Sequence, residues 1–207
     1  MDLDQKEIES PVQPELLPAT TEKKKDSWWD IIKFALITIA IVIPIRLYVA
    51  QPFIVSGASM DTTFANGQYL IVDELSYLLR DPKRGDVTIF KFPNDPSLFF
   101  IKRVVGLPGE TLQIKNGVVY IQAVGTTTPI RLTEPYVNNV NGNIGPITLK
   151  ADEYYVMGDN RDQSYDSRFW GPVPRDLFRG RALLRLFPPN TIGILPGYYD
   201  YQSANSK

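Results

Sequence analysis

The sequence predicts a mostly β protein, in which a single N-terminal transmembrane helix precedes an antiparallel β domain with a small β-rich subdomain insertion. Three observations predict this fold class. Residues 51–207 contain all 14 glycines and 13 of the 17 prolines. Short apolar or alternating runs recur between these glycines and prolines, which is the pattern of strands joined by turns. Before them, residues 34–45 form an uncharged run of 12 residues, which predicts the helix.

Residues 1–27 are predicted to be a disordered tail. They contain 11 charged residues, three prolines and no aromatic residue. Such a segment cannot bury enough apolar surface to offset the entropy lost on ordering.

Residues 28–50 are predicted to be a transmembrane anchor. The uncharged run is shorter than the usual minimum of about 18 residues for a membrane span. Lys33 and Arg46 lie near its ends, however, and their long side chains can reach the lipid headgroups, so the span can extend past them. As a helix, residues 28–50 would be about 34 Å long, enough to cross a bilayer core. Three aromatic residues lie where interfacial aromatics are found: Trp28, Trp29 and Tyr48.

Two alternatives for this segment are a buried core helix and a cleaved signal peptide. A core helix should have a polar face, whereas residues 34–45 offer only Thr38. A signal peptide usually has a short basic start rather than about 30 preceding residues. Five lysines lie in residues 1–33 and one arginine in residues 46–79, so the positive-inside rule predicts a cytoplasmic N-terminus and an extracytoplasmic domain at 51–207.

Within residues 51–207 we expect one mostly antiparallel β domain, large enough for a core of its own. Asn116-Gly117 between two apolar runs predicts a tight hairpin. Residues 107–152 are expected to form the β-rich subdomain. The predicted strands are Tyr69–Asp73, Asp86–Phe92, Leu98–Val105, Thr111–Lys115, Val118–Gln122, Tyr154–Met157 and Ala182–Phe187.

The composition excludes several kinds of chemistry. The chain has no cysteine and no histidine, which excludes disulfides, thiolate nucleophiles, Ser-His-Asp triads and most zinc sites. Acid–base chemistry must therefore use Asp, Glu, Lys or Tyr. A net charge of −1 provides no basic field for nucleic acid, which we do not expect as a partner.

A candidate nucleophile lies in residues 55–64, where small residues precede Ser59. Small side chains let a substrate backbone approach closely. Because the segment begins soon after Arg46, we expect it near the membrane surface. The alternative is a Ser/Gly-rich turn that only follows the anchor.

A candidate general base is Lys102, in the apolar run at residues 98–106. In a strand it shares one face with three apolar side chains: Leu98, Phe100 and Val104. If that face is buried, desolvation favours the neutral amine, which can act as a base near neutral pH. Arg103 falls on the opposite face and is expected to be structural. The alternative for Lys102 is an edge-strand lysine that extends to water.

A third segment, residues 158–174, interleaves Asp, Arg and Ser next to Trp and Gly. We expect a hydrogen-bonded network that orients a catalytic group. The competing interpretation is a metal loop with Asp159, Asp162 and Asp166 as ligands, against which the interposed arginines argue.

Together these segments resemble type I signal peptidase, a membrane-anchored Ser-Lys protease. The resemblance covers residues 28–190 in the family's order: the anchor, the segment around Ser59, Arg84–Val87, Lys102–Glu110 and Gly158–Pro174. It implies a serine endopeptidase at the plasma membrane that removes signal peptides from exported preproteins after Ala-x-Ala-like sites. It implies a lipid bilayer as partner, and neither cofactor nor metal.

The resemblance also implies roles for individual residues. Ser59 matches the nucleophile, whose backbone N–H is the expected oxyanion donor, and Lys102 matches the general base. Ser164 matches a serine that hydrogen-bonds the lysine amine. Three further residues match polar groups that hold the site together: Asp159, Asp166 and Arg168. Five match positions that line the substrate pockets: Val55, Met60, Phe64, Phe100 and Ile101.

Two positions depart from the family. Gly57 stands where some members have a serine that adds an oxyanion donor. Thr62 replaces the usual proline after Ser59-Met60, and the loss of a fixed φ is expected to loosen this turn.

Two rival functions remain. One is a different Ser-Lys processing protease, such as a self-cleaving repressor-type domain, which normally has no membrane span. The other is a membrane-tethered β domain that binds partners or is a degenerate family member. The presence of Ser59, Lys102 and Ser164 together argues against degeneracy.

Overall fold

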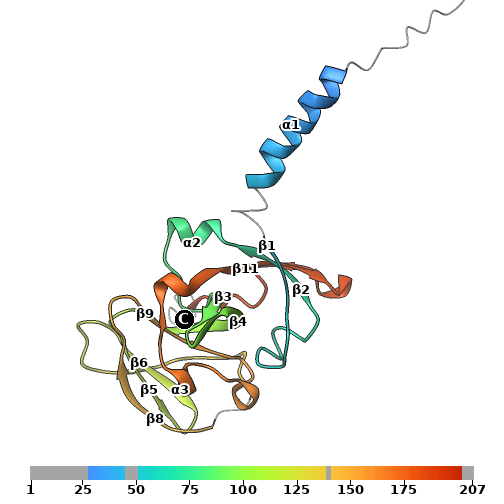
Figure 1. Ribbon diagram of the computed structural model, residues 1–207. Coiled ribbons are helices and arrows are strands. Elements are labelled where there is room, and N and C mark those ends of the chain that lie inside the picture. The colour runs from blue at the N-terminus through green and yellow to red at the C-terminus, as the bar shows by residue number, and fades with distance from the viewer. Residues whose placement is uncertain (1–27, 45–50, 139–140, 202–207) are drawn as a thin grey trace, which may run out of the picture. The chain divides into compact units, whose positions relative to one another are not determined.

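The computed structural model describes residues 28–44, 51–138 and 141–201. The residue contacts divide the chain after Ile39 into two units, which we describe separately. The predicted tail at residues 1–27 and residues 45–50 of the predicted anchor lie outside the described residues. Figure 1 shows the elements of the β region and their order.

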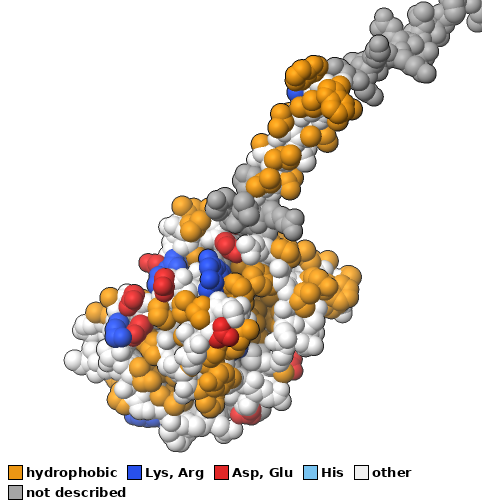
Figure 2. Space-filling view, viewed as in Figure 1, with side chains coloured by type: hydrophobic (Ala, Val, Ile, Leu, Met, Phe, Trp, Pro, Cys, Tyr) orange, Lys and Arg blue, Asp and Glu red, His pale blue; other side chains and the backbone are white. Residues whose placement is uncertain are grey.

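The N-terminal apolar segment forms helix α1, Trp28–Pro44. Its large apolar side chains are exposed over most of its surface, from Trp28 at 72% to Ile43 at 49%, and the space-filling view shows them around the helix (Figure 2). No helix among the described residues is both long enough and apolar enough to cross a membrane.

The β region is mostly antiparallel, as predicted. Its larger sheet has the strand order β1-β2-β11-β3-β4-β9-β10, with β12 paired to β11. The strands are β1 (Gln51–Ile54), β2 (Tyr69–Asp73), β3 (Val87–Phe92), β4 (Asp95–Gly106), β9 (Glu153–Met157), β10 (Val173–Pro174), β11 (Phe178–Phe187) and β12 (Gly193–Ile194).

A smaller sheet has the order β7-β6-β5-β8. Its strands are β5 (Thr111–Lys115), β6 (Val118–Gln122), β7 (Ile130–Arg131) and β8 (Ile144–Thr148). Asn116 and Gly117 join β5 to β6 with positive φ angles of 49° and 76°, the geometry of a tight hairpin turn. This sheet falls within residues 107–152.

All seven predicted strands are confirmed, three of them with the same bounds. The sequence prediction did not include β1, β7, β8, β10 and β12, nor the short helices α2 (Leu75–Leu79) and α3 (Ser167–Trp170). Five of these seven elements are only two to four residues long, and β8 contains Gly145 and Pro146, which interrupt an apolar pattern.

Three apolar clusters form the core. One includes Leu112 and Tyr155 and joins the smaller sheet to β9. A second includes Met60 and Phe64 and lies beneath the loop between β1 and β2. A third includes Phe90 and Val104 and packs against α3 through Trp170. The second and third clusters place β4 between two packed layers, and this position determines the environment of Lys102.

Candidate active site

The loop between β1 and β2 presents Ser59 at the surface of the domain. Backbone bonds fold it into a tight turn, with Asp61 N–H donating to Ala58 O (3.0 Å) and Phe64 N–H to Met60 O (2.7 Å). The side chains of Met60 and Phe64 are buried, at 1% and 0% exposed. They therefore fix the turn to the core and leave the hydroxyl of Ser59 free to face β4.

Lys102 on β4 points its amine at this hydroxyl. Its Nζ lies 2.7 Å from Ser59 Oγ and donates to Ile101 O at 3.0 Å. The lysine is only 4% exposed, and its amine lies 5.4 Å from the centre of the Phe100 ring. An amine and a hydroxyl at this distance can exchange a proton directly.

Burial changes the protonation of this amine. Desolvation lowers the pKa of Lys102 from 10.5 to about 8, although the carboxylates of Asp166 and Asp159 oppose the shift. Removal from water penalises the ammonium form more than the two carboxylates stabilise it. A useful fraction of the amine is therefore neutral near physiological pH and able to accept a proton.

The segment from Gly158 to Trp170 packs directly against the Ser59 loop. A Cβ atom on Gly158 would lie 2.4 Å from Ser59 O and 2.2 Å from Ser164 Oγ, so only glycine fits there. Asn160 donates its backbone N–H to Ser59 O and its side-chain amide to Ala58 O, each at 3.1 Å. Asn160 thus fixes the backbone on both sides of the Ala58–Ser59 peptide bond, a contact that the sequence analysis did not predict.

Buried ion pairs hold this segment in place. Arg103 binds Asp159 with two hydrogen bonds, at 2.8 and 2.6 Å, and Asp159 also accepts from Thr63 Oγ1 at 2.5 Å. Arg168 binds Asp166 at 2.8 Å. The Arg103–Asp159 pair joins β4 to the segment at 158–170 and so fixes it beside Ser59 and Lys102, whereas the Arg168–Asp166 pair braces the segment internally.

A third ion pair joins Arg161 to Glu134 at 2.5 Å, and both side chains are almost fully buried. Arg161 also donates to Gly158 O at 3.1 Å. The sequence analysis missed Glu134, because nothing in its local pattern distinguishes it from an exposed loop carboxylate.

The competing metal-loop interpretation has no support in these contacts. The carboxylates of Asp159 and Asp166 are each bound to an arginine, and no group of three metal-ligating acidic side chains comes together in the described part of the chain.

Ser164 differs from its expected role. Its Oγ is buried and has no hydrogen-bond partner, whereas the amine of Lys102 binds Ser59 Oγ and Ile101 O. The hydrogen bond that the family resemblance implied between Ser164 and Lys102 is therefore not formed. The hydroxyl of Ser164 instead lies against the backbone at Gly158.

A cavity of about 380 Å³ opens beside Ser59 and Lys102. Three of the five expected pocket residues line it: Val55, Phe100 and Ile101. Met60 and Phe64 do not line it, because their side chains point into the core beneath the turn. The expectation was wrong for these two, since the sequence does not show which way side chains point within an irregular turn. Lining residues that the sequence analysis missed include Phe53, Leu70, Ile89 and Tyr165.

Thr62 adopts a backbone conformation that proline cannot reach. Its φ is 91°, whereas the proline ring fixes φ near −65°. Its N–H donates to Asp61 Oδ1 at 2.9 Å and its hydroxyl to Tyr136 O at 3.1 Å. Side-chain hydrogen bonds thus hold this turn in place of a proline ring, and the expected loosening stays a prediction.

Comparison with known proteins gives consistent matches. The family described as signal peptidase, peptidase S26, matches residues 28–187. A probable signal peptidase I-2 from Synechocystis sp. is 36% identical over 84% of this chain and 83% of its own length. A signal peptidase I from Leptolyngbya laminosa is 38% identical over 90% of this chain and 93% of its own. A crystal structure of a signal peptidase I from Enterococcus faecalis, 28% identical, covers 49% of this chain and 97% of that chain with a TM-score of 0.42.

The pKa of Lys102 predicts the pH dependence of any reaction that uses its neutral amine. With a pKa of about 8, the neutral fraction rises with pH through this value and is nearly complete above it. We expect kcat/KM for peptide cleavage to fall about tenfold per pH unit below pH 8 and to level off above it. An activity that stays constant from pH 6 to 9, or that rises only near pH 10.5, would contradict the role of this burial.

Proposed function

Because the chain belongs to the signal peptidase family, peptidase S26, and is an enzyme of that family, we propose that it removes signal peptides from exported preproteins with Ser59 as nucleophile and Lys102 as general base. The observation that carries the proposal is the 2.7 Å contact between Ser59 Oγ and a buried lysine amine. In a chain without histidine or cysteine, a neutral lysine beside a serine is a complete nucleophile–base pair.

In the acylation step, the neutral amine of Lys102 takes the proton of Ser59 Oγ as the oxygen attacks the scissile carbonyl carbon. The backbone N–H of Ser59 donates to the oxyanion that develops. The intermediate collapses as the C–N bond breaks, and the ammonium of Lys102 returns its proton to the leaving amine. An ester between Ser59 and the signal peptide remains.

In the deacylation step, Lys102 takes a proton from a water molecule that attacks this ester. The second intermediate collapses, the proton passes from Lys102 to Ser59 Oγ, and the signal peptide leaves with a free carboxylate. Both half-reactions use the same base and need no group beyond those of the chain and water.

The open edge of β4 provides a place for an extended substrate. Strand β9 pairs with β4 only from Arg103 onward, while residues 98–101 line the cavity. An extended peptide can add to this edge as a further strand. The apolar walls at Val55 and Ile101 accept small side chains, and larger ones would clash, which fits cleavage after Ala-x-Ala-like sites.

Four polar residues are proposed to support the pair. Asp159 binds Arg103 and Thr63 and so holds the segment at 158–170 beside the reacting atoms, while Asp166 and Arg168 bind each other within that segment. The carboxylates of Asp166 and Asp159 also attract the ammonium form of Lys102, and so oppose the lowering of its pKa by desolvation. Ser164 is proposed to support the site by packing against Gly158.

Helix α1 is proposed as part of a membrane anchor spanning residues 28–50, with residues 1–27 in the cytoplasm and residues 51–207 outside the plasma membrane. Its support is the belt of exposed apolar side chains on α1 and the excess of lysine before it. A lipid bilayer offers these side chains an apolar environment. An anchor of this kind also keeps the enzyme at the membrane that its proposed substrates cross.

Replacement of either member of the pair should abolish cleavage. In Ser59→Ala no nucleophile remains. In Lys102→Arg the charge remains but the base is lost, since a guanidinium does not deprotonate. We expect each variant to lower kcat for preprotein cleavage in detergent by about 10²- to 10⁴-fold. Lys115→Arg, at an exposed lysine of the smaller sheet, is the control and should retain full activity. Normal turnover by Lys102→Arg would refute the assignment of the base.

The absence of cysteine allows the topology to be tested with single cysteines in the full chain. In intact cells a membrane-impermeant maleimide should label Thr126→Cys, on an exposed loop, but should label Thr20→Cys only after permeabilisation. The protein should also stay with the membrane fraction in alkaline carbonate. The reverse labelling would invalidate the orientation, and release by carbonate would invalidate the anchor.

A further inference from the structure

A second cavity of about 480 Å³ lies next to the one at the active site. The two cavities share Phe99 as a wall. Phe99 is 46% exposed and stacks edge-on against Phe53 at 5.6 Å. A peptide that extends from the first cavity past this pair of rings therefore reaches the second.

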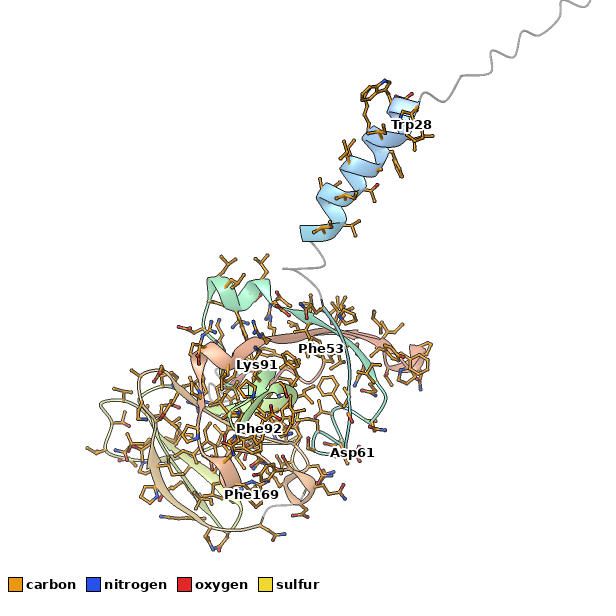
Figure 3. The ribbon with its side chains drawn as sticks, in the orientation of Figure 1. Trp28, Phe53, Asp61, Lys91, Phe92 and Phe169 are labelled. Carbon is orange, nitrogen blue, oxygen red and sulfur yellow. The ribbon has the colours of Figure 1, made fainter. Side chains whose placement is uncertain are left out.

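The lining residues place the two cavities on the same face of the larger sheet. Side chains alternate along a strand, so residues two apart share a face. On β1, Gln51 lines the second cavity and Phe53 the first. On β3, Lys91 lines the second and Ile89 the first. Figure 3 labels Phe53 and Lys91 on their strands. The second cavity thus continues the first along the sheet.

The chemistry of the second cavity differs from that of the first. Its walls include Lys91, Arg179 and Glu74, whereas the first cavity is mostly apolar. Within the described residues neither Lys91 nor Arg179 forms a salt bridge. Glu74 is the only acidic side chain in the walls, and the charge of Arg179 opposes the rise that burial causes in its pKa. The cavity therefore has an excess of positive charge and open hydrogen-bond donors, which favour a carboxylate.

The register of β4 indicates which part of a substrate reaches this cavity. Lys102 lies at the cut, and the apolar pockets that accept small residues before the cut extend from there toward Phe99. A peptide laid along β4 advances at the same rise per residue as the strand. Its first to third residues before the cut then lie beside residues 102–100. The next three lie beside residues 99–97, of which Phe99 and Ser97 line the second cavity.

We propose that the second cavity is a specificity site that binds the side chains four to six residues before the cut and favours an acidic one. This inference rests on the proposed function, because it takes its register from cleavage at Ser59. It makes Lys91 and Arg179 determinants of substrate choice, although neither belongs to the motif segments around Ser59, Lys102 or Asp159.

The test compares three peptides with the same small-residue cleavage site that differ only five residues before the cut, where they have Glu, Gln or Lys. With the full-length protein in detergent, we expect kcat/KM to be about three- to tenfold higher for the Glu peptide than for the Lys peptide, the range of a partly exposed charge pair. The ratio should shrink toward one as salt is raised, because ions screen the attraction.

Charge reversal identifies the residues responsible. Lys91→Glu and Arg179→Glu should each bring the Glu/Lys ratio to one or invert it, and the milder Lys91→Gln should reduce it. Lys115→Glu makes the same change of charge on an exposed strand of the smaller sheet, and should leave the ratio as in the wild type. Because each ratio is taken within one protein, a partial loss of folded enzyme does not alter it.

The outcomes separate this inference from the function on which it rests. If the wild type cleaves the Gln peptide but has no preference between Glu and Lys, or if Lys91→Glu and Arg179→Glu keep the preference, the specificity site is refuted and the protease assignment stands. If the wild type cleaves none of the peptides, both fall. A change of the same size in Lys115→Glu would show that only net charge matters, which also refutes the site.

Discussion

The structure depends on the removal of one lysine amine from water. Lys102 is 4% exposed, and the cost of burying an ammonium ion there lowers its pKa to about 8. Burial alone would produce only an inert amine. The contact of 2.7 Å with Ser59 Oγ places the hydroxyl proton of the proposed nucleophile within reach of this amine. The proposed chemistry needs both conditions at one position.

The surrounding fold maintains this burial through its charged residues. Adjacent residues of β4 face opposite sides of the sheet, so the strand that places Lys102 beside Ser59 also places Arg103 in the interior. Arg103 binds Asp159, and Gly158 and Asn160 bring the same segment against the backbone of Ser59. The Arg103–Asp159 pair thus helps to fix the distance between Ser59 and Lys102, which lie 43 residues apart in the sequence. Among the residues that the structure describes no carboxylate forms a salt bridge with Lys102, so desolvation outweighs the attraction of Asp166 and Asp159 and its pKa stays low.

Local sequence patterns were sufficient for much of the fold, and together with the family resemblance they singled out Ser59 and Lys102, which the structure brings into contact. Alternation predicted β2, β5 and β6 with the bounds that the structure has, and a lysine on an apolar strand face pointed to Lys102. Short edge strands such as β10 were missed because their pairing is determined by distant partners. Residue roles within turns were less predictable: Met60 and Phe64 face the core, and Ser164 does not reach the amine. Glu134 and the cations of the second cavity, Lys91 and Arg179, have no local signal, since only the folded chain brings Glu134 to Arg161 and places the two cations at one cavity.

The most direct test of this account is an NMR titration of the full-length protein in detergent with 13C-labelled lysine, in which the signal of Lys102 is assigned by its loss in Lys102→Arg. The account predicts that this one amine titrates near pH 8. A pKa close to the ordinary value of 10.5 would show that water reaches the amine, and would contradict the claim that desolvation makes Lys102 a base.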